Sequence, residues 1–167
     1  EGTSRSFYLS LKELPSGVRS QVGLLYLLAR TSDTIADSER GSTDDRLAAL
    51  EQYNEYAQGR SDSSPDLSEL AQLQGIDSER KLLESMPTTV ACIGRFSDSD
   101  QFHIRRCLDI IVGGQSLDLR RFSSAAEGEV VALSEDAELD DYAYRVAGSV
   151  GEFWTRMALD HLYDTDV

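Results

Sequence analysis

The sequence predicts an all-α protein, and its apolar pattern carries that prediction. Apolar residues recur at helical spacing over several long stretches, as in helices that turn one face to a core. The sequence has no segment of any length in which Val, Ile and Thr alternate with polar residues, which is the pattern of strands. With 167 residues, 40% of them hydrophobic, we expect a single helical domain over residues 1–167.

Breaks at Pro, Gly and hydroxyl residues divide the helical pattern into segments. A short amphipathic turn ends at Pro15, and a long helix follows from about Val18 to Asp37 or Ser38. That helix is apolar with hardly a break over 22–29, so we expect it to be buried. The segments 42–45 and 97–100 offer N-caps for the helices after them. The other helices are expected at about 44–58, 66–74, 78–85, 86–96, 99–121 and 138–162.

Small residues mark two places of expected close packing. Gly113 and Gly114 lie inside the expected helix 99–121, where each weakens the helix by about 1 kcal/mol, so we expect close packing or a kink there. The expected last helix has an apolar stripe of Leu139, Tyr142, Val146, Val150, Phe153 and Met157. Beside this stripe, Ala147, Gly148 and Gly151 would let another helix or a ligand chain come close.

The charge balance limits the classes of partner that the protein can bind. The net charge is −14, with 14 Arg and only 2 Lys, which argues against nucleic acid because phosphate binding needs a basic face. An acidic surface poor in Lys is also typical of halophilic proteins, so a high-salt source is a side hypothesis. No secretion signal or membrane-spanning run is visible, so we expect a cytoplasmic protein, with peripheral membrane contact left open. Cys92 and Cys107 are expected to be free thiols.

Asp33 and Asp37 are the first candidate site residues. Positions i and i+4 share one helix face, so both carboxylates should point the same way, with Arg30 and Tyr26 on or beside that face. Their mutual repulsion makes sense when a divalent cation lies between them. The same spacing recurs at 62/66, 136/140 and 160/164, but in polar surroundings where a solvated face is expected.

Ser4, Arg5 and Ser6 are a second candidate site. Two hydroxyls around a guanidinium are suited to bind an anion. An N-cap for the following helix is an equally good interpretation of the residues alone.

Four stretches, in this order, together resemble the squalene/phytoene synthase family, the head-to-head prenyl synthases of the all-α isoprenoid synthase fold. They are Thr3-Ser4-Arg5-Ser6-Phe7, Tyr26 to Arg30 with Asp33 to Asp37, Gly114-Gln115-Ser116-Leu117-Asp118-Leu119, and Tyr142 to Gly151. The resemblance covers nearly the whole chain. It implies a helical bundle around a central cavity, in which two farnesyl or geranylgeranyl diphosphates give squalene, dehydrosqualene or phytoene.

The resemblance also implies roles for particular residues. Asp33 and Asp37 match the first aspartate-rich motif, which binds diphosphate through Mg²⁺. Tyr26 and Arg30 match flanking residues that help to hold and ionise the diphosphate, and Tyr142 matches a catalytic tyrosine. As lone aromatics, Tyr26 and Tyr142 would otherwise be read as core. By the same match, the residues implied to bind the diphosphate are Ser4, Arg5, Ser6 and Phe7. Those implied to line the prenyl channel are Val146, Ala147, Gly148 and Val150.

Two further consequences of the resemblance stay open. Asp118 matches an acidic position whose role is either functional or structural packing. The family's second aspartate-rich motif lies beyond Val167, so we expect a fragment or a truncated form that lacks the last helices.

The partner that the resemblance implies is a prenyl diphosphate, and NADPH is needed only if squalene is the product. The rival hypotheses are a non-catalytic scaffold or partner subunit with this fold, and an acidic interaction domain.

Overall fold

The computed structural model describes residues 5–38, 41–123 and 131–163, and every regular element in these ranges is helical. The all-α prediction is therefore confirmed. In chain order the elements are α1 (Arg5–Glu13), α2 (Ser16–Ala36), α3 (Thr43–Ala57), α4 (Ser68–Gln72), α5 (Asp77–Glu84), α6 (Met86–Ala91), the 3-10 turn η1 (Cys92–Arg95), α7 (Asp98–Arg121), α8 (Asp136–Ala143), the π-helical turn η2 (Tyr144–Gly148) and α9 (Ser149–Leu162).

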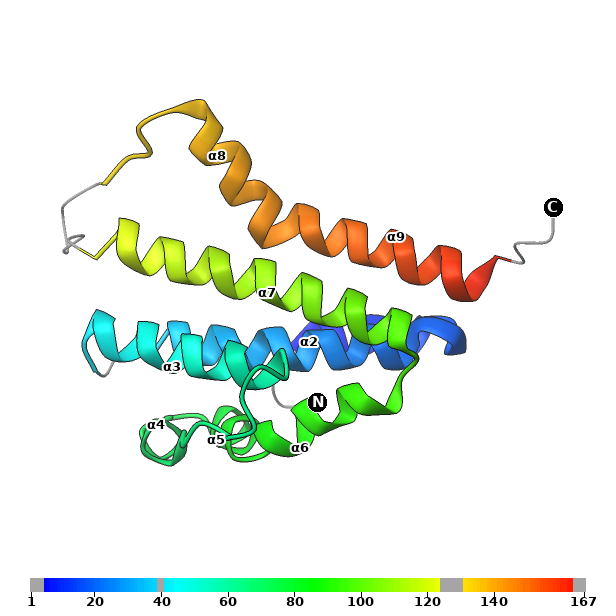
Figure 1. Ribbon diagram of the computed structural model, residues 1–167, viewed down its shortest axis with the longest axis horizontal. Helices are drawn as coiled ribbons and strands as arrows, with labels where there is room; N and C mark the ends of the chain where they lie inside the picture. Colours follow the sequence, from blue (N-terminus) through cyan, green and yellow to red (C-terminus); the bar gives the residue numbers. More distant parts are fainter. Residues whose placement is uncertain (1–4, 39–40, 124–130, 164–167) are drawn as a thin grey trace.

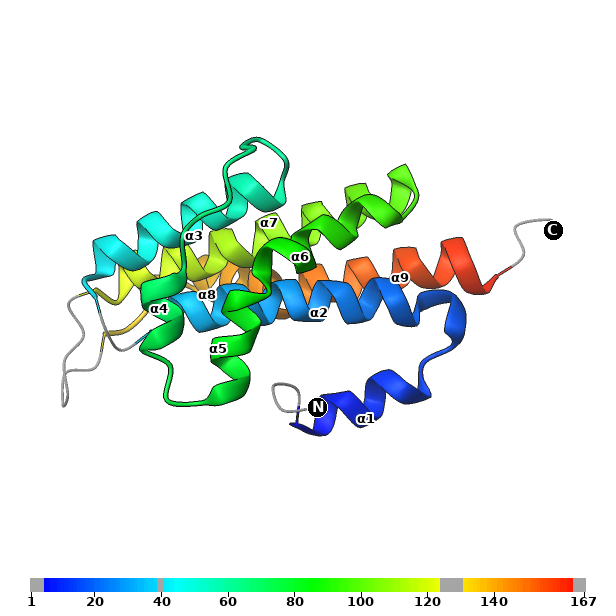
Figure 2. The ribbon, with the colours of Figure 1, turned by 90° about the horizontal axis from the view of Figure 1, so that it is seen from below.

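Helix α2 is the centre of the bundle, as its apolar sequence predicts. It contacts α7, α3 and α9 as well as α1, α5 and α6, so almost every side of it is covered (Figures 1 and 2). Leu28 and Ile35 are fully buried. The hydroxyls of Thr31 and Thr34 are buried too, and each donates to a carbonyl of its own helix at 2.9 Å. Polar residues are therefore tolerated in this core because they are satisfied within α2.

Two predicted helix starts are confirmed. Ser42 caps α3 through a capping box, because its hydroxyl accepts from the Asp45 backbone N–H while the Asp45 carboxylate accepts from the Ser42 backbone N–H. Ser97 caps α7 by accepting from the Asp100 backbone N–H at 3.2 Å. Gly41 lies between α2 and α3 with φ of 92°, a conformation that favours glycine.

The glycine pair in α7 marks close packing rather than a break, since α7 runs unbroken from Asp98 to Arg121. A Cβ atom on Gly114 would lie 2.9 Å from the Cβ of Arg145 in η2. A Cβ on Gly113 would meet only the far end of the same side chain, at 3.2 Å. The absence of a side chain at position 114 therefore lets α7 and η2 approach each other.

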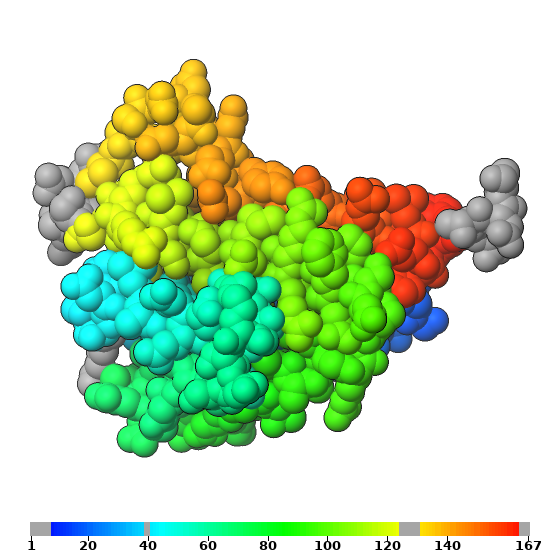
Figure 3. Space-filling view, viewed as in Figure 1, coloured from blue at the N-terminus to red at the C-terminus, as the bar shows by residue number. Residues whose placement is uncertain are grey.

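The helical segment predicted at about 138–162 is present, but the apolar stripe in its first half is not buried. The helical run begins at Asp136, and η2 interrupts it with i→i+5 hydrogen bonds that shift the side-chain register. Helix α8 also angles away from α7 and protrudes from the body (Figures 1 and 3). Leu139 and Val146 are consequently 55% and 45% exposed, whereas Phe153 and Met157 in α9 are buried.

A polar cluster joins the C-terminal end of α9 to the rest of the bundle. His161 Nε2 lies 2.7 Å from Asp100 Oδ1, and the Gln21 side-chain amide donates to Asp100 Oδ2 at 3.3 Å. This contact makes His161 part of the packing between α9 and α7. Cys107 is buried and Cys92 half-buried, and both are free thiols, as predicted. None of the described helices is both long and apolar enough to cross a bilayer.

Candidate functional site

The two candidate carboxylates lie at the C-terminal end of α2. Asp33 is in its last turn, and Asp37 follows directly, with its backbone N–H donating to the Asp33 carbonyl at 2.8 Å. The i, i+4 relation expected from the sequence therefore holds. A helix C-terminus carries partial negative charge, so two carboxylates there are repelled by the helix end as well as by each other. A bound cation would reduce both repulsions.

Asp33 is held by residues from two helices. Gln115 of α7 donates from Nε2 to Asp33 Oδ1 at 2.5 Å, and Arg30 Nη1 lies 3.9 Å from Oδ2. Burial raises the pKa of the Asp33 carboxyl above its ordinary value, against the opposing effect of Arg30. Asp37 adds to the rise and the Gln115 hydrogen bond opposes it. A bound cation would stabilise the charge that this environment disfavours.

Arg30 is directed by an acidic residue of α5. Its Nη2 donates to Glu79 Oε1 at 2.8 Å, and both side chains are largely buried. Its buried Nε has no hydrogen-bond partner in the described part of the chain. One turn earlier, Tyr26 is half-buried, and burial raises the pKa of its phenol, with Arg30 opposing and Asp33 adding to the rise. Tyr26, Arg30 and Asp33 are thus electrostatic neighbours on α2, and Asp37 follows at its C-terminal end.

An open pocket of about 360 Å³ adjoins this group. Asp37, Gln115 and Asp118 line it, so the structure places the acidic position of the third motif beside the first. Burial raises the pKa of the Asp118 carboxyl, and Arg121 opposes the rise. Arg46 also lines the pocket, where it donates to the carbonyl of Ala36 at 3.3 Å. Residues of α2, α3 and α7 and of the segments just after them form its walls.

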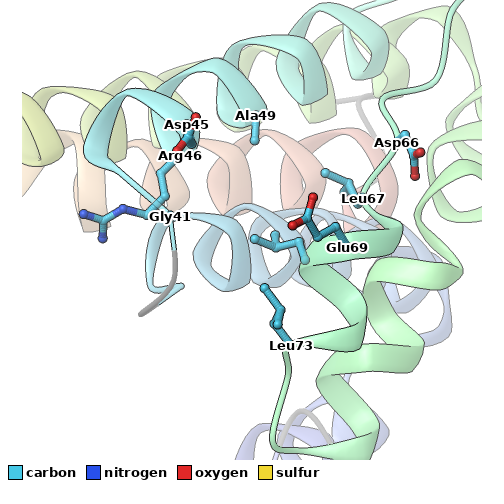
Figure 4. A pocket seen from close by; sticks show the side chains of 9 residues that line it. Gly41, Asp45, Arg46, Ala49, Asp66, Leu67, Glu69 and Leu73 are labelled. Atoms are coloured by element: carbon cyan, nitrogen blue, oxygen red, sulfur yellow. The ribbon is translucent and has the colours of Figure 1, made fainter.

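A second pocket, of about 260 Å³, lies between α3 and α4 (Figure 4). Arg46 lines it as well, but its guanidinium points away from Leu67 and Leu73 of this pocket. Asp66 and Glu69 give it acidic edges, and no residue of the four sequence motifs lines it. The pocket beside Asp37 is therefore the better candidate for function.

Tyr142 and the predicted prenyl-channel residues do not line the pocket beside Asp37. Tyr142 is 39% exposed on α8, and Ala147 and Gly148 are exposed on η2. Val146 is exposed as well, while Val150 packs against the core. Ser4 lies outside the described residues. For Arg5, Ser6 and Phe7 the description covers only their backbone, at the start of α1.

Sequence reasoning missed the contacts that hold the first motif. Glu79 lies 49 residues from Arg30 in the chain and belongs to no motif, so no local signal could identify it. Gln115 stands inside the third motif, but its contact with Asp33 spans 82 residues. Only the packing of α2 against α5 and α7 joins these pairs.

The residues present fit a magnesium ion. Within the described ranges, no group of three or more His, Cys, Asp or Glu side chains is arranged to hold a metal. Magnesium does not require such a cage, because it binds through one or two carboxylates and completes its shell with water and substrate phosphates. Asp33 and Asp37 supply that kind of donor set. The buried Gln115 Oε1, without a hydrogen-bond partner among the described residues, is a further unsatisfied acceptor beside them.

The bundle and its acidic, arginine-flanked site fit the isoprenoid synthase class. Residues 1–166 match the sequence model of the squalene/phytoene synthase family. The chain therefore belongs to the squalene/phytoene synthase family, as the resemblance of its motifs predicted.

Two curated relatives are similar to the chain. A bifunctional lycopene cyclase/phytoene synthase of Blakeslea trispora is 27% identical over an alignment of 164 residues, which covers 93% of this chain and 23% of that protein. A squalene synthase of Schizosaccharomyces pombe is 41% identical over 51 residues, 30% of this chain and 11% of that protein. The matched region thus spans less than a quarter of either relative.

Proposed function

We propose that the protein is a prenyltransferase of the head-to-head type, and that Asp33 and Asp37 bind the diphosphate of a prenyl diphosphate through Mg²⁺. The observation that carries the proposal is the position of both carboxylates at the C-terminal end of α2, beside an open pocket and the guanidinium of Arg30. Family membership supports head-to-head condensation of prenyl diphosphates as the reaction class.

The residues have distinct tasks in this proposal. Ionisation of an allylic diphosphate places negative charge on the leaving group, and Mg²⁺, when bound, stabilises that charge as a Lewis acid. Asp33 and Asp37 hold the ion. Arg30, aimed by Glu79, donates hydrogen bonds to the diphosphate. A tyrosine phenol, with an ordinary pKa of about 10, already keeps its proton at neutral pH. Burial raises the pKa of Tyr26 further, so its hydroxyl remains a donor.

The remaining family residues complete the proposal. Tyr142 acts at the reacting carbons, and Ser4, Arg5, Ser6 and Phe7 contact the diphosphate. Val146, Ala147, Gly148 and Val150 line the path of the prenyl chain, where small side chains leave room for it. A carbocation intermediate requires such apolar surroundings because water would quench it. Asp118, which lines the same pocket as Asp37, adds a further carboxylate near the diphosphate.

The product is squalene, dehydrosqualene or phytoene, from farnesyl or geranylgeranyl diphosphate. One relative is named a phytoene synthase and another a squalene synthase, so their names support either branch. NADPH enters only with squalene, and no residue of this chain is assigned to it. Because the product is apolar, peripheral contact of the protein with a membrane is part of the proposal.

Isothermal titration calorimetry with a non-reactive farnesyl diphosphate analogue, with and without Mg²⁺, tests the proposal. The wild-type chain should bind the analogue only with Mg²⁺, and an Asp33→Asn/Asp37→Asn variant should lose this binding. Asp136→Asn/Asp140→Asn is the matched control, because it removes a carboxylate pair of equal spacing from α8. If the folded wild-type chain does not bind the analogue, the result would favour a non-catalytic scaffold with this fold.

A further inference from the structure

We propose that Gln115 is a positioning residue for Asp33: its side-chain amide holds the carboxylate in the orientation that receives the divalent cation. The inference rests on the proposed function, because it needs Asp33 to be a metal ligand. It adds a residue of α7 to a site whose expected metal ligands both come from the end of α2.

The contact itself is short and joins two helices. Gln115 Nε2 lies 2.5 Å from Asp33 Oδ1, which is shorter than N–H···O hydrogen bonds usually are. The other oxygen, Oδ2, lies 3.9 Å from Arg30 Nη1. The Asp33 side chain is 44% exposed, so packing alone leaves it rotamer freedom. The amide therefore orients one oxygen and leaves the other available.

The orientation of the amide follows from its surroundings. With Nε2 toward Asp33, the Gln115 Oε1 is buried and without a hydrogen-bond partner among the described residues. The reverse orientation would place two acceptor oxygens against each other whenever Asp33 is ionised. An amide that served only to join two helices would satisfy both of its ends. Here one end remains unsatisfied beside the pocket that Gln115 shares with Asp37 and Asp118.

The position of Gln115 is itself set by close packing. The preceding residue, Gly114, lies so near Arg145 of η2 that a Cβ there would be 2.9 Å from the Arg145 Cβ. This contact limits how α7 can shift or rotate at this level. The contact between Gln115 and Asp33 is therefore made with no ligand bound, as a preorganised metal site requires.

Binding of Mn²⁺ as a spectroscopic substitute for Mg²⁺, followed by electron paramagnetic resonance, tests the inference in the full chain with the diphosphate analogue present. Gln115→Met keeps the side-chain length without the donor, and Gln115→Asn keeps the amide but shortens its reach. Each should weaken Mn²⁺ binding about 10-fold, as loss of a residue that orients a metal ligand does. Gln101→Met makes the same change elsewhere on α7 and should leave the affinity unchanged.

A double-mutant cycle separates positioning from a general effect on structure. The loss caused by Gln115→Met should disappear in an Asp33→Asn background and persist in an Asp37→Asn background. Equal losses in both backgrounds, or wild-type affinity in both Gln115 variants, would overturn the inference while leaving the proposed function intact. A wild-type chain that binds no Mn²⁺ with the analogue would overturn the proposed function, and the inference with it. Thermal unfolding of each variant verifies that it is folded.

Discussion

The interface between α2 and α7 has the same pair of residue types at both ends, with opposite consequences. At one end, the Gln21 amide of α2 donates to Asp100 of α7, and His161 completes the cluster. At the other end, the Gln115 amide of α7 donates to Asp33 of α2. The Asp100 side chain is only 5% exposed, whereas the Asp33 side chain is 44% exposed and adjoins a pocket.

The difference lies in how completely each carboxylate is satisfied. Both oxygens of Asp100 have partners from other helices, so the carboxylate is fully satisfied. We call this end closed, and its cluster stabilises the bundle. Asp33 has one close partner, a distant arginine and a neighbouring carboxylate that repels it. A Gln–Asp contact between helices is therefore no sign of function by itself. Incomplete satisfaction beside an open pocket distinguishes the end that we propose to be functional.

The largest expected effect on stability is at the closed end. Asp100→Ala leaves the Gln21 amide and His161 without their buried acceptor, so we expect the free energy of unfolding to fall by about 2–3 kcal/mol. Urea denaturation followed by circular dichroism measures this loss. Asp98→Ala, at an exposed position of the same first turn of α7, is the control and should cost no more than about 0.5 kcal/mol. Equal losses in both variants would mean that the closed cluster does not stabilise the bundle.

A smaller effect is expected from Gly114→Ala, which tests the packing that places Gln115. The new methyl group would lie 2.9 Å from the Arg145 Cβ, and relieving that overlap should cost about 1–2 kcal/mol. Gly151→Ala is the matched control, since nothing lies within 4 Å of its Cβ position. That variant should gain up to about 1 kcal/mol from helix propensity. Opposite signs in thermal unfolding support the close approach of α7 and η2, and equal signs contradict it.

The smallest effect on the free energy of unfolding is expected at Asp33, at the open end of the interface, in the metal-free protein. Because the pKa of Asp33 is higher in the folded chain, the folded state binds this proton more tightly. Stability should therefore fall as the pH rises from the ordinary Asp value, about 3.9, through the folded value. Asp33→Asn should remove this fall and stabilise the metal-free protein at pH 7 by no more than about 0.5 kcal/mol, since solvent screens a partly exposed group. A variant less stable than wild type at pH 7, measured in EDTA by denaturation, would refute this expectation.

The sequence by itself determined the local features of this protein. The apolar run of α2 predicts its burial, Ser42 and Ser97 predict their caps, and four-residue spacing places Asp33 and Asp37 on one face. These features depend on residues within a turn or two of each other, where helix geometry fixes the neighbours. The ordered motifs identified the family for the same reason, because each is a short local pattern.

Only the tertiary structure decided which distant residues meet. The contacts Arg30–Glu79, Asp33–Gln115 and Asp100–His161 join residues 49, 82 and 61 positions apart, and no local periodicity encodes them. The π-helical turn likewise shifted the register before α9 and left Leu139 exposed, although the apolar stripe predicted its burial. The physical reason is that satisfaction of a buried polar group, and burial of an apolar one, depend on how helices pack against each other.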